Sequence, residues 1–252
     1  MKRAGEKRQF HGAIWAAATM GVAGALFFGA SALVDVSPFK LGRIELTGNT
    51  RTPPEHVMRI AGLIEGESIF KRDIDDVGED IAKLPWVREA KVTRRLPSTL
   101  YIEVEEFQPA YLISLAGRLY YFSGDGKVIE APLGGGLDFP VITGFSWSAL
   151  EGDRQKRAEL MELLGKVSEE NFGGRVEEIH FDPEDGFFVT GDFPYCSRIR
   201  FGRGELDRKL DLLERLRKTL ERRGEFAKTA DLTYDDRIVA RLESSVRERG
   251  KK

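Results

Sequence analysis

The chain has 252 residues, of which 41% are hydrophobic and 32% are charged, and its formal net charge is −2. This composition is typical of a folded body, and a charge so close to zero argues against a nucleic-acid-binding surface. A single cysteine, Cys196, excludes an internal disulfide, and together with only three histidines it argues against a zinc site.

The N-terminal part of the chain predicts a membrane anchor. Lys and Arg prevail in residues 1–11, whereas residues 12–34 contain no charged side chain. A helix of about 23 residues is about 34 Å long, enough to cross a bilayer core of about 30 Å. Because basic flanks stay in the cytoplasm, we expect a cytoplasmic tail over residues 1–11, a single transmembrane helix over 12–34, and a periplasmic or extracellular body.

Two alternatives to the anchor are a cleavable signal peptide and a buried core helix, but a buried core helix would normally show one polar face. A cleavable signal peptide would end in small residues, as Ala30-Ser31-Ala32 does, but its apolar core would be shorter, so we favour an uncleaved anchor. Gly21, Ala25 and Gly29 recur every four residues and form a face on which a second membrane helix can pack closely. A segment rich in Gly and Ala also produces such a match by chance.

Residues 41–107 predict one small module of order β-α-α-β-β, with both helices on one side of a three-stranded sheet. The first strand alternates apolar and charged side chains. Thr52-Pro53-Pro54-Glu55 has the spacing of a capping box and begins a helix that Gly62 ends. A second helix begins near Asp73. Two further strands alternate, and their inward residues are Ala90, Val92, Leu100, Ile102 and Val104.

Three motifs of this module resemble a known family. They are Leu46-Thr47-Gly48-Asn49, Leu84-Pro85-Trp86-Val87 and the pattern A-x-V-x-R-x-x-P-x-T-L-x-I-x-V-x-E from Ala90 to Glu106. Together they are similar to the POTRA domain of the FtsQ/DivIB family of bacterial cell-division proteins. The resemblance implies a POTRA domain at residues 39–107 of a single-pass inner-membrane protein at the division septum.

After residue 107 the pattern changes to many short strands with two amphipathic helices. This predicts a second, mixed β domain over residues 108–242, and hence an α+β protein. We expect helices at about 153–170 and 205–223, and strands at 110–115, 119–122, 127–130, 141–144, 176–181, 186–190, 197–201, 229–233 and 237–242. Residues 243–252 are highly charged and predict a disordered tail.

No motif of catalytic chemistry stands out from the sequence. His180 and Asp182 have no candidate nucleophile nearby, and Gly134-Gly135-Gly136 lacks the Lys-Ser/Thr of a phosphate loop. Cys196 has only Arg198 as a cationic neighbour, so we interpret it as structural. We therefore expect a protein that is not an enzyme and that uses no cofactor, metal or small-molecule substrate.

The family resemblance extends into the second domain and implies its partners. It includes Leu119–Val128, Ile199–Arg203 and Ala230–Tyr234. In this family the last strands bind the periplasmic segment of FtsB, itself paired with FtsL, and the POTRA domain is implicated in recruitment by other divisome proteins. Carried over to this chain, the partner-binding residues are Arg203, Tyr234, Asp236, Arg237, Ile238, Val239, Ala240, Arg241 and Leu242.

The physical basis for such binding is β-augmentation, because an open strand offers unpaired N–H and C=O groups to a partner segment. Arg203 is suited to bidentate binding of a partner carboxylate. Simple strand packing for Tyr234 and a surface charge for Arg203 are the competing explanations. The chain also departs from the family at Asp235-Asp236-Arg237, where a Gly is common.

A different function remains as an alternative. A POTRA-bearing outer-membrane assembly or secretion component would bind unfolded chains. It would need repeated POTRA units or a C-terminal series of alternating transmembrane strands of about ten residues each. The sequence contains neither pattern.

Overall fold

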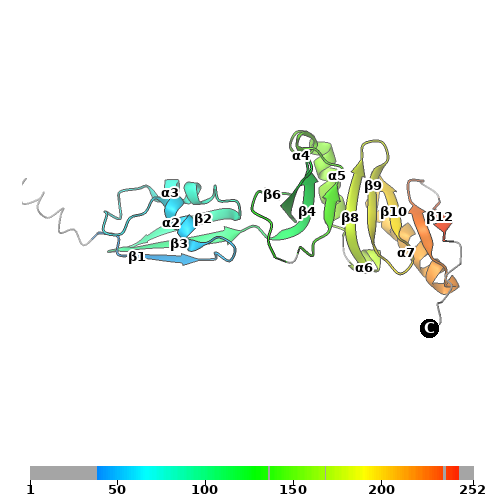
Figure 1. Cartoon of the computed structure of the whole chain (residues 1–252), viewed down its shortest axis with the longest axis horizontal. Helices are drawn as coiled ribbons and strands as arrows, with labels where there is room; N and C mark the ends of the chain where they lie inside the picture. The colour runs from blue at the N-terminus through cyan, green and yellow to red at the C-terminus, as the bar shows by residue number, and fades with distance from the viewer. Residues whose placement is uncertain (1–38, 136, 168, 235–236, 244–252) are drawn as a thin grey trace, which may run out of the picture. The chain divides into compact units, whose positions relative to one another are not determined.

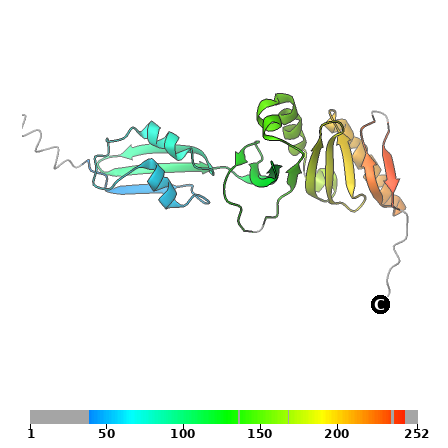
Figure 2. The same ribbon diagram turned by 45° about the horizontal axis from the view of Figure 1, so that its top comes forward.

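The computed structural model describes residues 39–135, 137–167, 169–234 and 237–243. The predicted membrane helix with Gly21, Ala25 and Gly29, the cytoplasmic tail, Asp236 and residues 244–252 lie outside this part of the chain. Two compact units make up the chain: an N-terminal unit that ends at Glu106 and a C-terminal unit that begins at Phe107. Each unit has its own sheet and its own helices (Figures 1 and 2).

The N-terminal unit has the predicted β-α-α-β-β order. Its elements are β1 (Arg43–Thr47), α2 (Pro54–Ala61), α3 (Ile74–Ile81), β2 (Val87–Arg95) and β3 (Thr99–Glu106). The sheet order is β1-β3-β2, with β1 parallel and β2 antiparallel to β3. Both helices cover one face of the sheet (Figure 2), and their apolar residues form a core with Val92, Leu100, Ile102 and Val104. The mixed α+β fold of this unit is confirmed.

Glu106, at the end of β3, holds the turn that follows β1. Its carboxylate accepts the backbone N–H of Arg51 at 2.8 Å and that of Thr52 at 2.7 Å, and Glu106 is buried. Burial by itself would raise the pKa of Glu106, but the hydrogen bonds to the charged form outweigh it and lower the pKa. Gly48 is required in the same turn, because its φ is +81° and a Cβ there would lie 1.9 Å from the Val104 carbonyl oxygen.

The N-terminus of α2 differs from the prediction. The expected capping box at Thr52 does not form: Pro53 is the N-cap and provides no side-chain hydrogen bond, while Pro54 occupies the first helical position. The physical reason is that Glu106 already takes the N–H of Thr52, which draws this backbone toward β3. At α3 the prediction is confirmed, because the Asp73 side chain accepts the N–H of Asp75.

The C-terminal unit is built on one long sheet. Its strands are β4 (Pro109–Leu115), β5 (Arg118–Ser123), β6 (Val128–Ile129), β7 (Val141–Thr143), β8 (Arg175–Asp182), β9 (Gly186–Asp192), β10 (Arg198–Gly202), β11 (Ala227–Asp231) and β12 (Val239–Leu242). Within the described residues the sheet has nine strands in the order β12-β11-β10-β9-β8-β7-β4-β5-β6. The two strands at its ends are therefore β6 and β12 (Figure 1).

Helices make two of the parallel connections of this sheet. β7 is joined to β8 through α4 (Trp147–Gly152), α5 (Arg154–Leu164) and α6 (Glu169–Phe172), and β10 is joined to β11 through α7 (Leu206–Arg223). The α7 helix packs on the core through Leu206, Leu213 and Leu220, and Gly224 ends it in a left-handed conformation. Its predicted range of 205–223 thus agrees closely with the structure.

The prediction of a single helix over 153–170 is wrong. Ser146 caps α4 by accepting the N–H of Ala149, and Asp153 caps α5 by accepting that of Lys156. The α5 helix ends before Gly165, and the chain resumes as the short α6. The break brings Phe172 into the core, where its carbonyl accepts the hydroxyl of Tyr195 at 2.8 Å.

Replacing Glu106 with Gln should destabilise the N-terminal unit by about 1–3 kcal/mol at pH 7, because the charged acceptor of two backbone N–H groups, of which that of Thr52 is buried, is lost. The folded-state pKa of Glu106 is lowered, so its contribution is complete above the ordinary Glu pKa of about 4.3 and is lost as the pH falls through the folded value. Urea unfolding and amide exchange at Arg51 and Thr52 measure both effects. Glu105→Gln, at an exposed neighbour, is the control, and equal stabilities of the two variants at pH 7 would contradict the assignment.

Candidate partner-binding edge

β12 lies at one end of the long sheet and is paired on one side. Among the described residues its only strand neighbour is β11, to which it runs antiparallel with Ala240 opposite Ala230 and Val239 opposite Asp231. We call the outward backbone of residues 238–242, with the side chains of Tyr234, Val239 and Leu242, the β12 edge. An end strand of this kind offers N–H and C=O groups to another strand.

The hydrogen bonds around β11 identify which amides of β12 point outward. Leu232 donates its N–H to Arg200 of β10 at 2.8 Å, so the preceding Asp231 faces β12. Glu243 donates its N–H to the carbonyl of Phe226 at 2.9 Å. Because backbone groups alternate along a strand, residues 239, 241 and 243 face β11, and the N–H groups of Ala240 and Leu242 face outward.

Side chains at the β12 edge are apolar and exposed. Val239 is 47% exposed, Leu242 46% and Tyr234 42%, whereas Ile238 and Ala240 pack against the core. Arg237 lies over the Tyr234 ring, with its guanidinium carbon 5.0 Å from the ring centroid. The β12 edge thus combines an open backbone with side chains that gain by being covered.

Two other end strands, β6 of the long sheet and β2 of the N-terminal sheet, are less suited to pairing. β6 has two residues, and the loop after it is held down by Tyr121, whose hydroxyl bonds both the N–H and the carbonyl of Gly134. β2 is longer, but most of its exposed side chains are charged, which discourages pairing. Length therefore favours the β12 edge over β6, and surface character favours it over β2.

Because β10 and β11 are parallel, their C-terminal ends lie side by side. Arg203, just after β10, therefore lies at the same edge of the sheet as the segment between β11 and Tyr234. It follows Gly202, where a Cβ would lie 2.9 Å from the Thr233 side chain. The Arg203 guanidinium donates to the carbonyl of Pro183 at 2.6 Å and stacks over Phe181 at 5.6 Å. The structure thus brings Arg203 near Thr233, while one of its nitrogens is used within the unit.

A charged network that the sequence did not indicate supports this region. Arg200 forms ion pairs with Asp185 and, at 3.3 Å, with Asp231. Asp231 also accepts the N–H of Thr233 at 3.0 Å and its hydroxyl at 2.6 Å. The network orients the chain between β11 and Tyr234. Arg200 alternates with the apolar Ile199 and Phe201 along the strand, but only the sheet order places Asp185 and Asp231 beside it.

Two pockets formed by the described residues lack the features of a catalytic site. A groove next to the end of β12 is lined by Phe193, Cys196, Leu220, Phe226 and Leu242 among others. Burial raises the pKa of the Cys196 thiol to about 12, so it is not a reactive nucleophile at neutral pH. The described residues contain no group of His, Cys, Asp and Glu side chains that could hold a metal ion.

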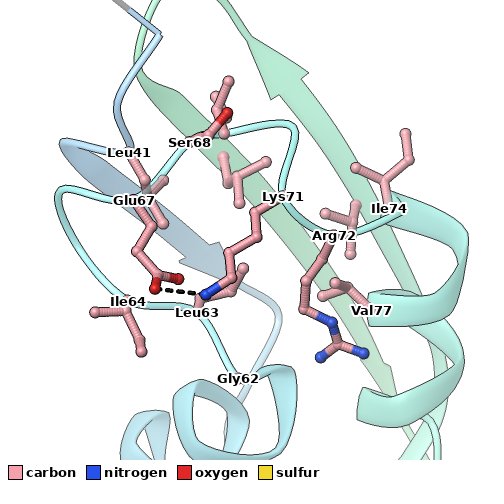
Figure 3. A pocket seen from close by; sticks show the side chains of 13 residues that line it. Leu41, Gly62, Leu63, Ile64, Glu67, Ser68, Lys71, Arg72, Ile74 and Val77 are labelled. Atoms are coloured by element: carbon pink, nitrogen blue, oxygen red, sulfur yellow. Dashed lines mark hydrogen bonds and ion pairs between the residues drawn. The ribbon is translucent and has the colours of Figure 1, made fainter. Parts of the chain in front are cut away.

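The second pocket belongs to the N-terminal unit (Figure 3). Apolar side chains, including Leu41, Ile74 and Val77, line it, and the ion pair of Lys71 with Glu67 crosses its rim at 2.5 Å. Its enclosed space is about 20 Å³, which has room for one water molecule. It is a packing defect beneath a loop and is too small for a ligand.

Comparison with known proteins gives the family. The family model described as "POTRA domain, FtsQ-type" matches residues 39–107. The cell division protein FtsQ of Geotalea daltonii is 35% identical over 214 residues, covering 81% of this chain and 76% of that protein. This chain belongs to the FtsQ family of cell division proteins.

Other FtsQ proteins support this conclusion. FtsQ of Anaeromyxobacter sp. (strain K) is 32% identical over 77% of this chain and 67% of its own length, and FtsQ of Syntrophotalea carbinolica is 29% identical over 94% and 88%. The resemblance seen in the sequence is thereby confirmed. Within the described residues, no helix is long and apolar enough to span a bilayer, and the predicted span lies outside them.

Proposed function

We propose that this chain is a non-catalytic scaffold of the bacterial division machinery, anchored in the inner membrane by residues 12–34 with residues 1–11 in the cytoplasm. Its body, a POTRA domain at 39–107 and a β domain at 108–242, acts in the periplasm at the septum. It links FtsB- and FtsL-like partners to the division site. Membership of the FtsQ family supports the role in cell division, and the observation that carries the binding mode is the one-sided pairing of β12.

The partner segment adds a strand next to β12 in this proposal. Its backbone pairs with the outward groups of Ala240 and Leu242, while its side chains cover Val239, Leu242 and Tyr234. Arg237 and Arg241 are the cations beside this strand and suit an acidic partner residue. Arg203, which also donates to Pro183, contributes at the rim near Thr233.

No observation favours the alternative of an outer-membrane assembly component. The family model matches one POTRA domain, and the C-terminal unit packs its apolar residues into a core around its own helices. The observations therefore support the division scaffold over this alternative.

Replacing Ala240 with Pro should weaken binding of an FtsB-like periplasmic peptide about tenfold, because proline removes an N–H that faces the partner. Calorimetric titration measures the affinity. Ala240→Gly keeps the N–H and should bind nearly as the parent does. The backbone N–H of Val239 faces β11, so Val239→Pro should instead loosen β12 itself. Equal affinity of Ala240→Pro and Ala240→Gly would reject pairing at this edge.

Replacing Tyr234 with Ala should weaken the same binding by about thirtyfold, the effect expected for an aromatic anchor at the centre of an interface. Its exposed ring makes this change tolerable for the fold. Tyr234→Phe tests the hydroxyl separately and should retain most of the affinity if ring burial dominates. A Tyr234→Ala variant that binds normally would place the interface elsewhere.

A fluorescent protein fused to the cytoplasmic N-terminus should give a band at mid-cell in dividing cells. The same fusion without residues 39–107 should be spread over the envelope if the POTRA domain recruits the chain. Imaging of both fusions at equal expression measures the fraction of signal at the septum. An even distribution of the complete chain would argue against the proposed role.

A further inference from the structure

The exposed apolar side chains of the N-terminal unit lie together at one end. Among its described residues, the large hydrophobic side chains on the surface are Phe39, Ile64 (59% exposed), Phe70 (53%) and Leu96 (59%). We call these four residues the apolar tip. Scattered single hydrophobics are ordinary on a protein surface, but their concentration at one end indicates a contact surface.

Ring contacts and backbone hydrogen bonds connect the apolar tip to the point where the chain enters the unit (Figure 1). The Phe39 and Phe70 rings meet edge to face at 5.8 Å, and Ile69 donates its N–H to the Phe39 carbonyl at 2.9 Å. On the other side, Gly42 donates its N–H to Ser98 at 2.8 Å, which places the turn that carries Leu96 next to the same segment.

The apolar tip is held by the fold. Arg94 donates to the carbonyls of Ile69 at 3.0 Å and Arg72 at 2.6 Å, and its guanidinium lies 5.3 Å from the Phe70 ring centroid. These bonds fix the loop that presents Phe70 and Ile64. Figure 3 shows the Ile64 side chain directed away from the pocket beneath this loop. A preorganised apolar surface loses little conformational entropy when it is covered.

Charges around the apolar tip have both signs. Lys71 pairs with Glu67 at 2.5 Å, and Arg95 lies 3.6 Å from Glu45. The surface therefore does not select a strongly acidic or basic partner. Aromatic and aliphatic side chains bordered by the long side chains of Lys71 and Arg95 suit the interface between lipid headgroups and acyl chains.

The length of the preceding chain points to the same occupant. The predicted membrane helix ends at Val34, and the five bonds between consecutive Cα atoms from Val34 to Phe39 reach at most about 18 Å. The headgroup region of one leaflet is about 5–8 Å thick. Phe39 is therefore confined near the membrane surface. This tether gives the apolar tip a high effective concentration at the lipid, so even a weak intrinsic affinity is enough for binding.

We propose that the apolar tip seats in the headgroup region of the membrane that anchors the chain, with Ile64, Phe70 and Leu96 reaching the acyl boundary. The inference rests on the proposed anchor at residues 12–34. Such seating would fix the orientation of the N-terminal unit relative to the bilayer. The alternative is that the apolar tip contacts another protein. A bilayer that contains no other protein distinguishes the two, because only lipid seating can occur there.

The experiment uses the full chain in phosphatidylcholine nanodiscs with a fluorophore on one introduced cysteine. Cys196 is buried and its thiol pKa is about 12, so it should not compete for the label. Probes at Ile64→Cys and Phe70→Cys should be quenched at least twofold by lipids that carry a shallow spin label. Glu105→Cys, near the far end of β3, should not be quenched.

Two further variants separate the possible failures. Leu26→Cys lies within the predicted span and should be quenched by deeply labelled lipids; its failure would overturn the anchor and the inference together. If Leu26→Cys is quenched while positions 64 and 70 behave as position 105 does, the anchor stands and lipid seating of the apolar tip is wrong.

A probe beside the apolar tip excludes attraction of the fluorophore itself to lipid. The exposed Glu65→Cys should be quenched in the parent chain, and Phe70→Ser with Leu96→Ser should reduce that quenching at least twofold. Phe70 and Leu96 are both exposed, so replacing them with serine should leave the fold intact. Unchanged quenching at position 65 would show that these side chains do not hold the unit on the bilayer.

Discussion

Within the described part of the chain, β12 pairs with a strand on one side only, and the proposed function depends on this constraint. A sheet that does not close must end in strands whose outward backbone groups lack strand partners, and here one end is β12. The other end, β6, is short and is followed by a loop held down by Tyr121. Unpaired N–H and C=O groups let an open strand pair with any other chain, which is an aggregation hazard. The same groups make a binding site when a specific partner strand pairs with them.

The long sheet also shows how a distant segment is brought to that end. The α7 helix carries the chain from β10 across to β11, and its leucines pack on the core beneath the strands. Arg200 then joins β8–β9 turn residue Asp185 to Asp231 on β11. Side chains far apart in the chain thus stabilise the segment before Tyr234, so the geometry of the proposed binding residues depends on the whole unit.

Several residues of the family motifs serve the fold of the N-terminal unit. Gly48 is needed because a side chain would collide with the Val104 carbonyl, and Glu106 closes the neighbouring turn through two N–H groups. Arg94 fixes the loop before α3 through two carbonyls. A motif that identifies a family need not mark its binding site. Here these residues stabilise the turns and loops of the fold.

Local periodicity was enough to predict the N-terminal fold and most strands, because alternation and helical spacing are properties of neighbouring residues. The α7 helix was predictable from its leucines and Gly224, and the last strand from residues 237–242. Local signals did not reveal the break between α5 and α6, since it exists to bring Phe172 to Tyr195. They also could not show the order of nine strands, the outward direction of the Ala240 amide, or the gathering of Phe39, Phe70 and Leu96. Those depend on contacts between residues far apart in sequence, which only the tertiary structure decides.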